Sequence, residues 1–179
     1  MKEQPKNPMT AHQVESFKSI LEIRREILAE SVSDVQSTRH RQEVAGVVND
    51  VEFINDSKAV SVGLTWYSLE RLEGELIWIV GGLQEGQDYT MLKELVQDKV
   101  RGIVCLGRES SKVYKTFMAC TEIIVGASTA EEAVKAALAL AKPGQKVILS
   151  PACPSHDLFE SYEDRGNQFT KAVQRLIKQ

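Results

Sequence analysis

Apolar and polar positions change their spacing along the chain, and this change separates predicted helices from predicted strands. In residues 12–31 the apolar side chains recur mostly at steps of three and four, which is typical of an amphipathic helix that needs a partner surface. Two short β-rich runs, 44–48 and 51–54, then flank the polar pair Asn49-Asp50. A polar turn between two such runs predicts a β-hairpin.

Beyond the hairpin, short apolar runs alternate with helical stretches. The predicted strands are 76–80, 102–106, 122–125 and 146–150, and the predicted helices are 62–72, 89–98, 110–117, 129–140 and 158–177. The strand cores are too apolar to face water on one side, which indicates parallel strands covered on both faces. We therefore predict an α/β fold, a Rossmann-like and mostly parallel sheet with helices on both faces, plus an N-terminal helix and a β-hairpin.

The run Asn55-Asp56-Ser57-Lys58 follows the second hairpin strand without a spacer. Asn, Asp and Ser favour turns and helix caps, so we expect the strand to end at Asp56 or Ser57. Lys58 would then stand at a helix N-terminus, where free backbone N–H groups favour an anion such as carboxylate or phosphate. The alternative is an ordinary N-capped helix whose Lys58 is only solvated.

Ligands of open α/β sheets bind beyond the carboxyl ends of the strands, and three loops, 55–61, 81–89 and 150–157, fit that description. The glycines of loop 81–89 match neither GxGxxG nor the P-loop. Ser155, His156 and Asp157 are adjacent, so they are not expected to form a hydrolase triad, although Ser155 or Asp157 could cap the next helix. Arg165 ordinarily would lie on a solvated helix face, but it could also pair with Asp56.

Composition narrows the classes of function. The 179 residues, 42% of them hydrophobic, suit one domain with a short N-terminal extension, and a formal charge of -3 argues against a nucleic-acid surface. No apolar run approaches the roughly 20 residues that span a bilayer, and the N-terminus lacks a signal-peptide core, so we expect a cytoplasmic protein. Three cysteines without a CxxC pair, and no ligand spacing for a metal, indicate neither a metal site nor a disulfide framework.

Four motifs in order resemble the C-terminal domain of the Mur ligases, in particular the branch that adds D-glutamate during peptidoglycan synthesis. They are Asn55-Asp56-Ser57-Lys58-Ala59, Gly81-Gly82 with Gly86 and Asp88, Leu149-Ser150-Pro151-Ala152-Cys153 with Ser155 and Asp157, and Glu163-Asp164-Arg165-Gly166. His40-Arg41-Gln42-Glu43 resembles the family's junction between its central and C-terminal domains. The resemblance places the domain boundary between residues 1–36 and 37–179.

The resemblance implies a cytoplasmic, ATP-dependent ligase in which an acyl phosphate is attacked by the amine of the incoming amino acid. Carried over by motif, Arg41 and Asp56 would bind the nucleotide, while Lys58, Ser155 and Tyr162 would bind D-glutamate. The ligands would be D-glutamate and ATP or ADP, and Mg would accompany ATP in the full-length family without ligands from this chain. The activity implied is cell-wall synthesis, with its consequences for cell shape and division.

Departures from the family pattern leave alternatives open. Val60 replaces a hydroxyl residue of the substrate site, and Glu85 stands where the family has Lys. Nothing in the sequence matches the P-loop, so no catalytic residue is expected in these 179 residues, and the chain alone should not ligate. It is therefore either the C-terminal part of a D-glutamate-adding ligase, a degenerate copy that binds without catalysis, or an interaction module that docks on an ATPase domain or a ligase.

Overall fold

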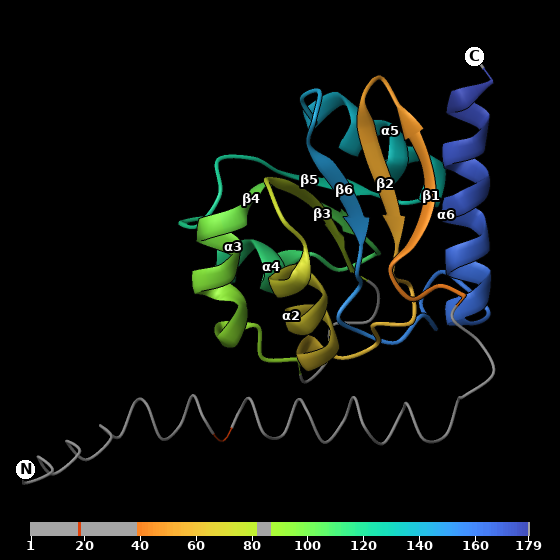
Figure 1. The fold of residues 1–179 in the computed structure, drawn as a ribbon. Coiled ribbons are helices and arrows are strands. Elements are labelled where there is room, and N and C mark those ends of the chain that lie inside the picture. Colours follow the sequence, from red (N-terminus) through yellow and green to blue (C-terminus); the bar gives the residue numbers. More distant parts are fainter. Residues whose placement is uncertain (1–17, 19–38, 82–86, 179) are drawn as a thin grey trace, which may run out of the picture. The chain divides into compact units, whose positions relative to one another are not determined.

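A six-stranded sheet forms the centre of this computed structural model, which describes residues 18, 39–81 and 87–178 (Figure 1). The strands are β1 (Glu43–Val48), β2 (Val51–Asn55), β3 (Leu76–Val80), β4 (Val100–Leu106), β5 (Ile124–Ala127) and β6 (Lys146–Leu149). Their order is β1-β2-β6-β3-β4-β5, and every pair is parallel except the antiparallel hairpin β1–β2. The α/β class, the mostly parallel sheet and the hairpin are thus confirmed.

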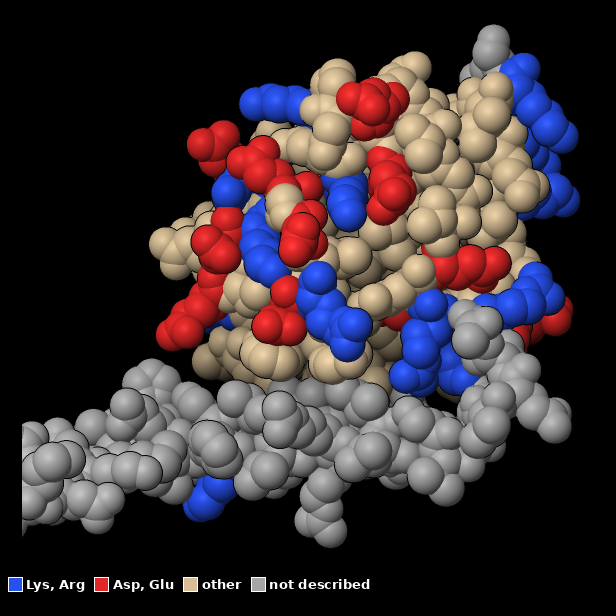
Figure 2. Space-filling model, in the orientation of Figure 1, with Lys and Arg blue, Asp and Glu red and all other residues tan. Residues whose placement is uncertain are grey.

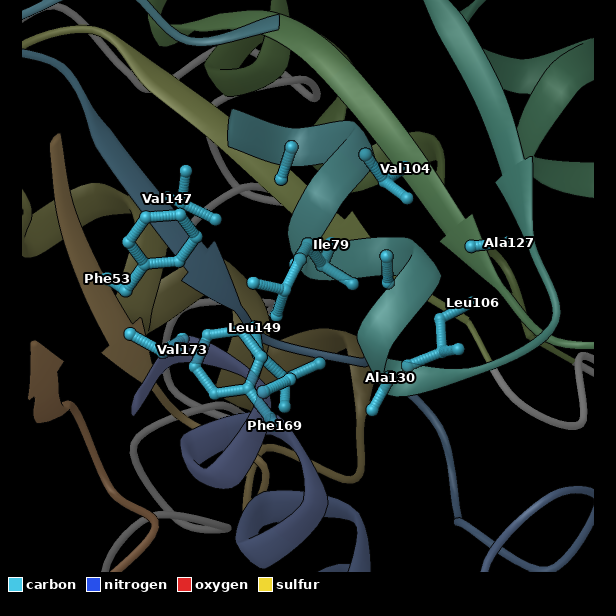
Figure 3. Packing of buried hydrophobic residues seen from close by; sticks show 14 of the residues in the cluster. Phe53, Ile79, Val104, Leu106, Ala127, Ala130, Val147, Leu149, Phe169 and Val173 are labelled. Atoms are coloured by element: carbon cyan, nitrogen blue, oxygen red, sulfur yellow. The ribbon is translucent and has the colours of Figure 1, made fainter. Parts of the chain in front are cut away.

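Helices cover both faces of the sheet. One face carries α2 (Val62–Arg71), the short 3₁₀ helix η1 (Thr90–Leu92), α3 (Lys93–Lys99) and α4 (Ser111–Phe117), and the other carries α5 (Ala130–Leu140) and α6 (Tyr162–Ile177). Each face buries its own apolar cluster. One cluster is centred on Trp78 and Phe117, whose rings pack edge to face with centroids 5.5 Å apart. The other is centred on Phe53, Leu149 and Phe169 (Figure 3).

The hairpin turn follows from its two residues. Asn49 and Asp50 both adopt positive φ, 51° and 62°, a backbone conformation that Asn and Asp tolerate better than most residues. Two consecutive positive values are what a tight two-residue hairpin turn requires, because its twist then matches that of the strands. The pair of polar residues therefore sets the register in which β2 enters the sheet.

Several predicted boundaries were wrong by a few residues. The strand predicted at 122–125 lies at Ile124–Ala127, and the helix predicted at 89–98 begins as a 3₁₀ turn and continues as α3. The last helix begins at Tyr162 and not at Leu158, because Ser161 is its N-cap and accepts a hydrogen bond from the backbone N–H of Asp164. Neither Ser155 nor Asp157 caps it.

The predicted helix 12–31 lies outside the described residues, except for Lys18, and so does Glu85. The division between residues 1–36 and 37–179 therefore stays a prediction. Within the described part, no helix is long and apolar enough to cross a membrane.

Candidate functional site

A pocket opens where β2 ends, between the loop that follows this strand and helix α2. The space in and in front of this pocket amounts to about 280 Å³, part of which is open solvent. The lining residues are Arg41, Gln42, Asp56, Lys58, Ala59, Leu64, Tyr67 and Ser68. Three of the residues singled out in the sequence, Arg41, Asp56 and Lys58, thus line one pocket. Lys and Arg side chains gather below the ends of β2 and β6, as Figure 2 shows in the orientation of Figure 1.

Asn55 ends the strand and shapes the loop. Its side-chain oxygen accepts a hydrogen bond from the backbone N–H of Ser57 at 3.2 Å, which turns the chain immediately after β2. Its amide nitrogen donates to the carbonyl of Gly166 and to the hydroxyl of Thr170, both at 3.0 Å. Asn55 is completely buried, so a single polar side chain ends the strand and attaches it to α6.

Lys58 does not stand at a helix N-terminus, which corrects the sequence prediction. Helix α2 begins at Val62, and its N-cap is Ser61, whose hydroxyl accepts from the N–H of Leu64 at 3.3 Å. The N–H of Lys58 instead donates to the carbonyl of His40 at 3.0 Å. The prediction failed because Asn55 uses its side chain within the turn, which delays the start of the helix.

Asp56 is a buried carboxylate at the base of the pocket, with 2% of its surface exposed. Burial raises its pKa to about 6, although hydrogen bonds from Ser68, Ser150 and the N–H of Gln42 favour the charged form. The Ser150 hydroxyl donates to one carboxylate oxygen at 2.8 Å and the Gln42 N–H to the other at 3.2 Å. The carboxylate is therefore held in one orientation, and two of the groups that donate to it are serine hydroxyls.

Tyr162 lies on the other side of Lys58. The ammonium nitrogen of Lys58 is 5.9 Å from the centre of the Tyr162 ring, within the range of a cation–π interaction. The Ser57 hydroxyl donates to the Tyr162 carbonyl at 2.8 Å, which holds the start of α6 against the loop. Lys58 thus connects the pocket with the N-terminal end of α6.

Ser155 belongs to the neighbouring loop and does not line the pocket. It is 3% exposed, and its carbonyl accepts from the N–H of Phe159 at 3.1 Å. The two loops are joined by a hydrogen bond from the N–H of Ala152 to the carbonyl of Ala59 at 3.0 Å. The structure therefore gathers Arg41, Asp56 and Lys58 around the pocket, and places Ser155, which is buried, in the adjoining loop.

Arg165 does not pair with Asp56, contrary to one possibility left open by the sequence. Its guanidinium is almost completely buried, at 1% exposure, and donates to Ser57, Cys153 and Pro154. The prediction of a solvated helix face was also wrong, because α6 turns this position toward the strand-end loops rather than toward water.

The sequence assigned no role to four polar residues of the site, Gln42, Tyr67, Ser68 and Ser150, although Gln42 and Ser150 lie within motifs of the family resemblance. Two of them, Tyr67 and Ser68, follow Leu64 by three and four positions, so they share one face of α2 with this pocket residue. That spacing could have indicated Tyr67 and Ser68 if Lys58 had been predicted in the loop before α2, because this face of the helix then borders the loop. Ser150 carries no such signal, because only the pairing of β2 with β6 brings it next to Asp56.

The pocket suits part of a nucleotide. A guanidinium and an ammonium can pair with phosphate, a fixed carboxylate can accept from ribose hydroxyls, and Ala59, Leu64 and the Tyr67 ring supply apolar surface. Within the described ranges no three His, Cys, Asp or Glu side chains form a group that could hold a metal ion. The three cysteines are free thiols, Cys105 and Cys153 buried and Cys120 partly so.

Known proteins resemble this chain in sequence and in fold. The sequence model of the family described as "Mur ligase, glutamate ligase domain" matches residues 40–153. The UDP-N-acetylmuramoylalanine–D-glutamate ligase of Christiangramia forsetii is 43% identical over 175 residues, which are 98% of this chain and 39% of that protein. The ligase of the same name from Porphyromonas gingivalis is 43% identical over 156 residues, 87% of this chain and 35% of that protein.

A solved structure shares the fold. It is a domain described as part of a UDP-N-acetylmuramate:L-alanyl-γ-D-glutamyl-meso-diaminopimelate ligase from Haemophilus ducreyi, with a TM-score of 0.51 and 17% identity. The match covers 77% of this chain and 98% of that domain. The two D-glutamate ligases are much longer than this chain, which spans 39% and 35% of their lengths.

Proposed function

Since this chain belongs to the Mur ligase family and carries its C-terminal, glutamate ligase domain, we propose that it acts as the C-terminal domain of a UDP-N-acetylmuramoyl-L-alanine:D-glutamate ligase. In that role it binds nucleotide and amino acid and closes over an ATPase domain, so that an amide bond forms in peptidoglycan biosynthesis. The reaction takes place in the cytoplasm. The domain is not expected to be active alone.

The observation that carries the proposal is the convergence of Arg41, Asp56 and Lys58 on one pocket. We assign the guanidinium of Arg41 and the carboxylate of Asp56 to the nucleotide. A buried carboxylate that already accepts hydrogen bonds from the hydroxyls of Ser68 and Ser150 is well placed to accept from the hydroxyls of a ribose. The cationic side chains at the pocket favour phosphate by charge-assisted hydrogen bonds.

We assign the amino acid to the region between Lys58, Tyr162 and the loop that carries Ser155. D-Glutamate carries two carboxylates, and an ammonium with a hydroxyl on the next loop gives each carboxylate a separate partner. The Tyr162 ring, which faces the Lys58 ammonium, would cover the aliphatic part of the ligand. The same Lys58 thus borders both the nucleotide and the amino acid.

ATP, when bound, supplies the phosphoryl group that activates a carboxylate as an acyl phosphate. The residues of this chain orient the nucleotide and the incoming amine and help to exclude water from them. Mg accompanies ATP in the family, and we assign it no ligand from this chain.

The test is an NMR titration of the chain with ADP and with D-glutamate, separately and together. We expect ADP to shift the amides of residues 41–42, 56–59 and 64–68, and D-glutamate to shift those of 58 and 155–162. Asp56→Asn should weaken ADP binding more than D-glutamate binding, while Lys58→Ala should weaken both. Lys115→Ala, an exposed position on α4, is the control. Unchanged spectra at millimolar ligand would refute the proposal.

A second candidate function, binding without catalysis, is favoured by Val60. This residue adjoins the pocket loop and offers no hydroxyl where the family has one. If the site has lost D-glutamate, Val60→Thr combined with Glu85→Lys should restore binding that the wild-type chain lacks. If the wild-type chain binds D-glutamate and supports ligation when supplied with an ATPase domain of the family, the second candidate is excluded.

A further inference from the structure

We propose that Arg165 is a positioning residue, which fixes the loop that carries Lys58 relative to the loop that carries Ser155. The inference takes its ligand, a dicarboxylate amino acid, from the proposed function. The coupling of the two loops by Arg165 comes from the geometry alone and can be tested without a ligand.

The guanidinium of Arg165 donates to four oxygen atoms on two loops. Toward the loop after β2, the Nε atom donates to the Ser57 hydroxyl and the NH2 group to the Ser57 carbonyl, both at 2.9 Å. Toward the loop after β6, the NH1 group donates to the carbonyls of Cys153 and Pro154, both at 3.2 Å. All three nitrogens of the planar group are thus engaged, and they join segments about a hundred residues apart in the chain.

Burying a charged residue between two loops costs desolvation free energy. Arg165 is 1% exposed, and removing a guanidinium from water costs several kcal/mol unless its hydrogen bonds are satisfied. The carboxylate of Asp157 lies near enough to interact with this charge, and both of its oxygens are buried without a hydrogen-bond partner in the described structure. An apolar side chain of similar size could fill the space, but it could not fix the directions of four carbonyl and hydroxyl oxygens.

The bonded oxygens are next to the residues assigned to the ligand. Ser57 directly precedes Lys58, and Pro154 directly precedes Ser155. Because the backbone at both neighbours is held by one rigid planar group, the distance between the Lys58 and Ser155 backbones cannot change without breaking hydrogen bonds of Arg165. A ligand that needs both residues therefore meets a preformed spacing and loses less conformational entropy on binding.

The strand order explains why one side chain can reach both loops. β6 lies between β2 and β3, so the loops that leave β2 and β6 emerge side by side from the same edge of the sheet. The adjacent loop after β3 is attached as well, since the N–H of Gly81 donates to the carbonyl of Pro151 at 3.2 Å. Arg165 enters from α6 and completes this connection from the opposite side.

The test compares four forms of the full chain: wild type, Arg165→Lys, Ser57→Ala and Val173→Ala. Lys keeps the charge but lacks the planar fork. Ser57→Ala removes one of the four acceptors of Arg165, together with the hydrogen bond from the Ser57 hydroxyl to the Tyr162 carbonyl. Val173, on the same helix and completely buried, is the matched control, because its truncation should destabilise the domain without touching either loop. Amide hydrogen exchange at Lys58, Ala152 and Phe159 is measured relative to amides of β3, together with D-glutamate affinity by NMR.

We expect Arg165→Lys to speed exchange at those three amides together, by about tenfold or more relative to the sheet. We also expect it to weaken D-glutamate binding by roughly 10- to 100-fold, the effect that loss of supporting partners has on metal sites. Ser57→Ala should give the same pattern at smaller amplitude, and it decides the question if Arg165→Lys does not fold. Val173→Ala should change exchange in the sheet and loops alike and leave affinity unchanged.

Three results would overturn the proposal: loop exchange that follows the sheet in both Arg165→Lys and Ser57→Ala, the loop pattern appearing equally in Val173→Ala, or, with a wild-type chain that binds D-glutamate, the same affinity in Arg165→Lys. Failure of the proposed function looks different. The wild-type chain would then ignore D-glutamate, while the joint loosening of the two loops in Arg165→Lys would still support Arg165 as the residue that couples them.

Discussion

Asp56→Asn should make the chain more stable at neutral pH and less able to bind nucleotide. Burial raises the pKa of the Asp56 carboxyl from its usual 3.8 to about 6, so the folded state disfavours the charged form. Below pH 3.8 the group is protonated in both the folded and unfolded states, and no penalty exists. As the pH rises toward 6 the unfolded chain ionises first, and the wild-type protein loses stability.

The magnitude follows from the gap between the two pKa values. About two pKa units correspond to about 3 kcal/mol in full, of which about 2 kcal/mol is lost between pH 4 and pH 8. Asn has no charge to bury, but its amide nitrogen cannot accept a hydrogen bond from the Ser150 hydroxyl. The loss of that hydrogen bond costs about 1 kcal/mol of stability at every pH. The variant should therefore be close to wild type at pH 4 and more stable at pH 8.

The assay is urea unfolding at both pH values, followed by fluorescence of Trp66 and Trp78. Only the difference between variant and wild type is used, so that the titration of other groups cancels. Asp50→Asn, the same substitution at an exposed position of the hairpin turn, is the control. A difference for Asp56→Asn that does not change between pH 4 and pH 8 would refute the burial argument.

Three further predictions concern other parts of the site. Lys58→Ala should weaken ADP binding, measured by calorimetry, and change the free energy of unfolding by less than about 1 kcal/mol, since its ammonium reaches an open pocket; a large loss of stability would contradict that placement. Trp78→Phe should cost roughly 2–4 kcal/mol in urea unfolding, because it leaves a cavity and removes the 2.7 Å hydrogen bond from the indole to the Ser150 carbonyl; a neutral effect would show that the site does not need this support. Gly166→Ala should destabilise the protein by roughly 1–3 kcal/mol, because the new methyl group would meet the His40 ring. It should also shift the NMR signals of Lys58, since the backbone carbonyl of His40 accepts a hydrogen bond from the Lys58 N–H; unchanged Lys58 signals would show that His40 does not transmit the change.

The helices, the strands and the family resemblance could be predicted from the amino-acid sequence. Hydrophobic spacing is a local property, and it located all six strands, including the two of the hairpin, within a few residues. The Asn49-Asp50 turn could be identified because a polar pair separates two β-rich runs, and both residue types tolerate the positive φ that the turn adopts. The motif Asn55-Asp56-Ser57-Lys58 placed the site at a strand end, because apolar residues give way there to polar ones without a spacer.

Tertiary structure alone decided how the loops meet. The position of β6 between β2 and β3 brings Ser150 to Asp56 and the loop of Ser155 to that of Lys58, and no spacing within one segment encodes that order. The same holds for Arg165, whose charge and helical position predict a solvated side chain. It is buried because four oxygen atoms from two distant loops converge on it, and such an environment exists only after the chain has folded.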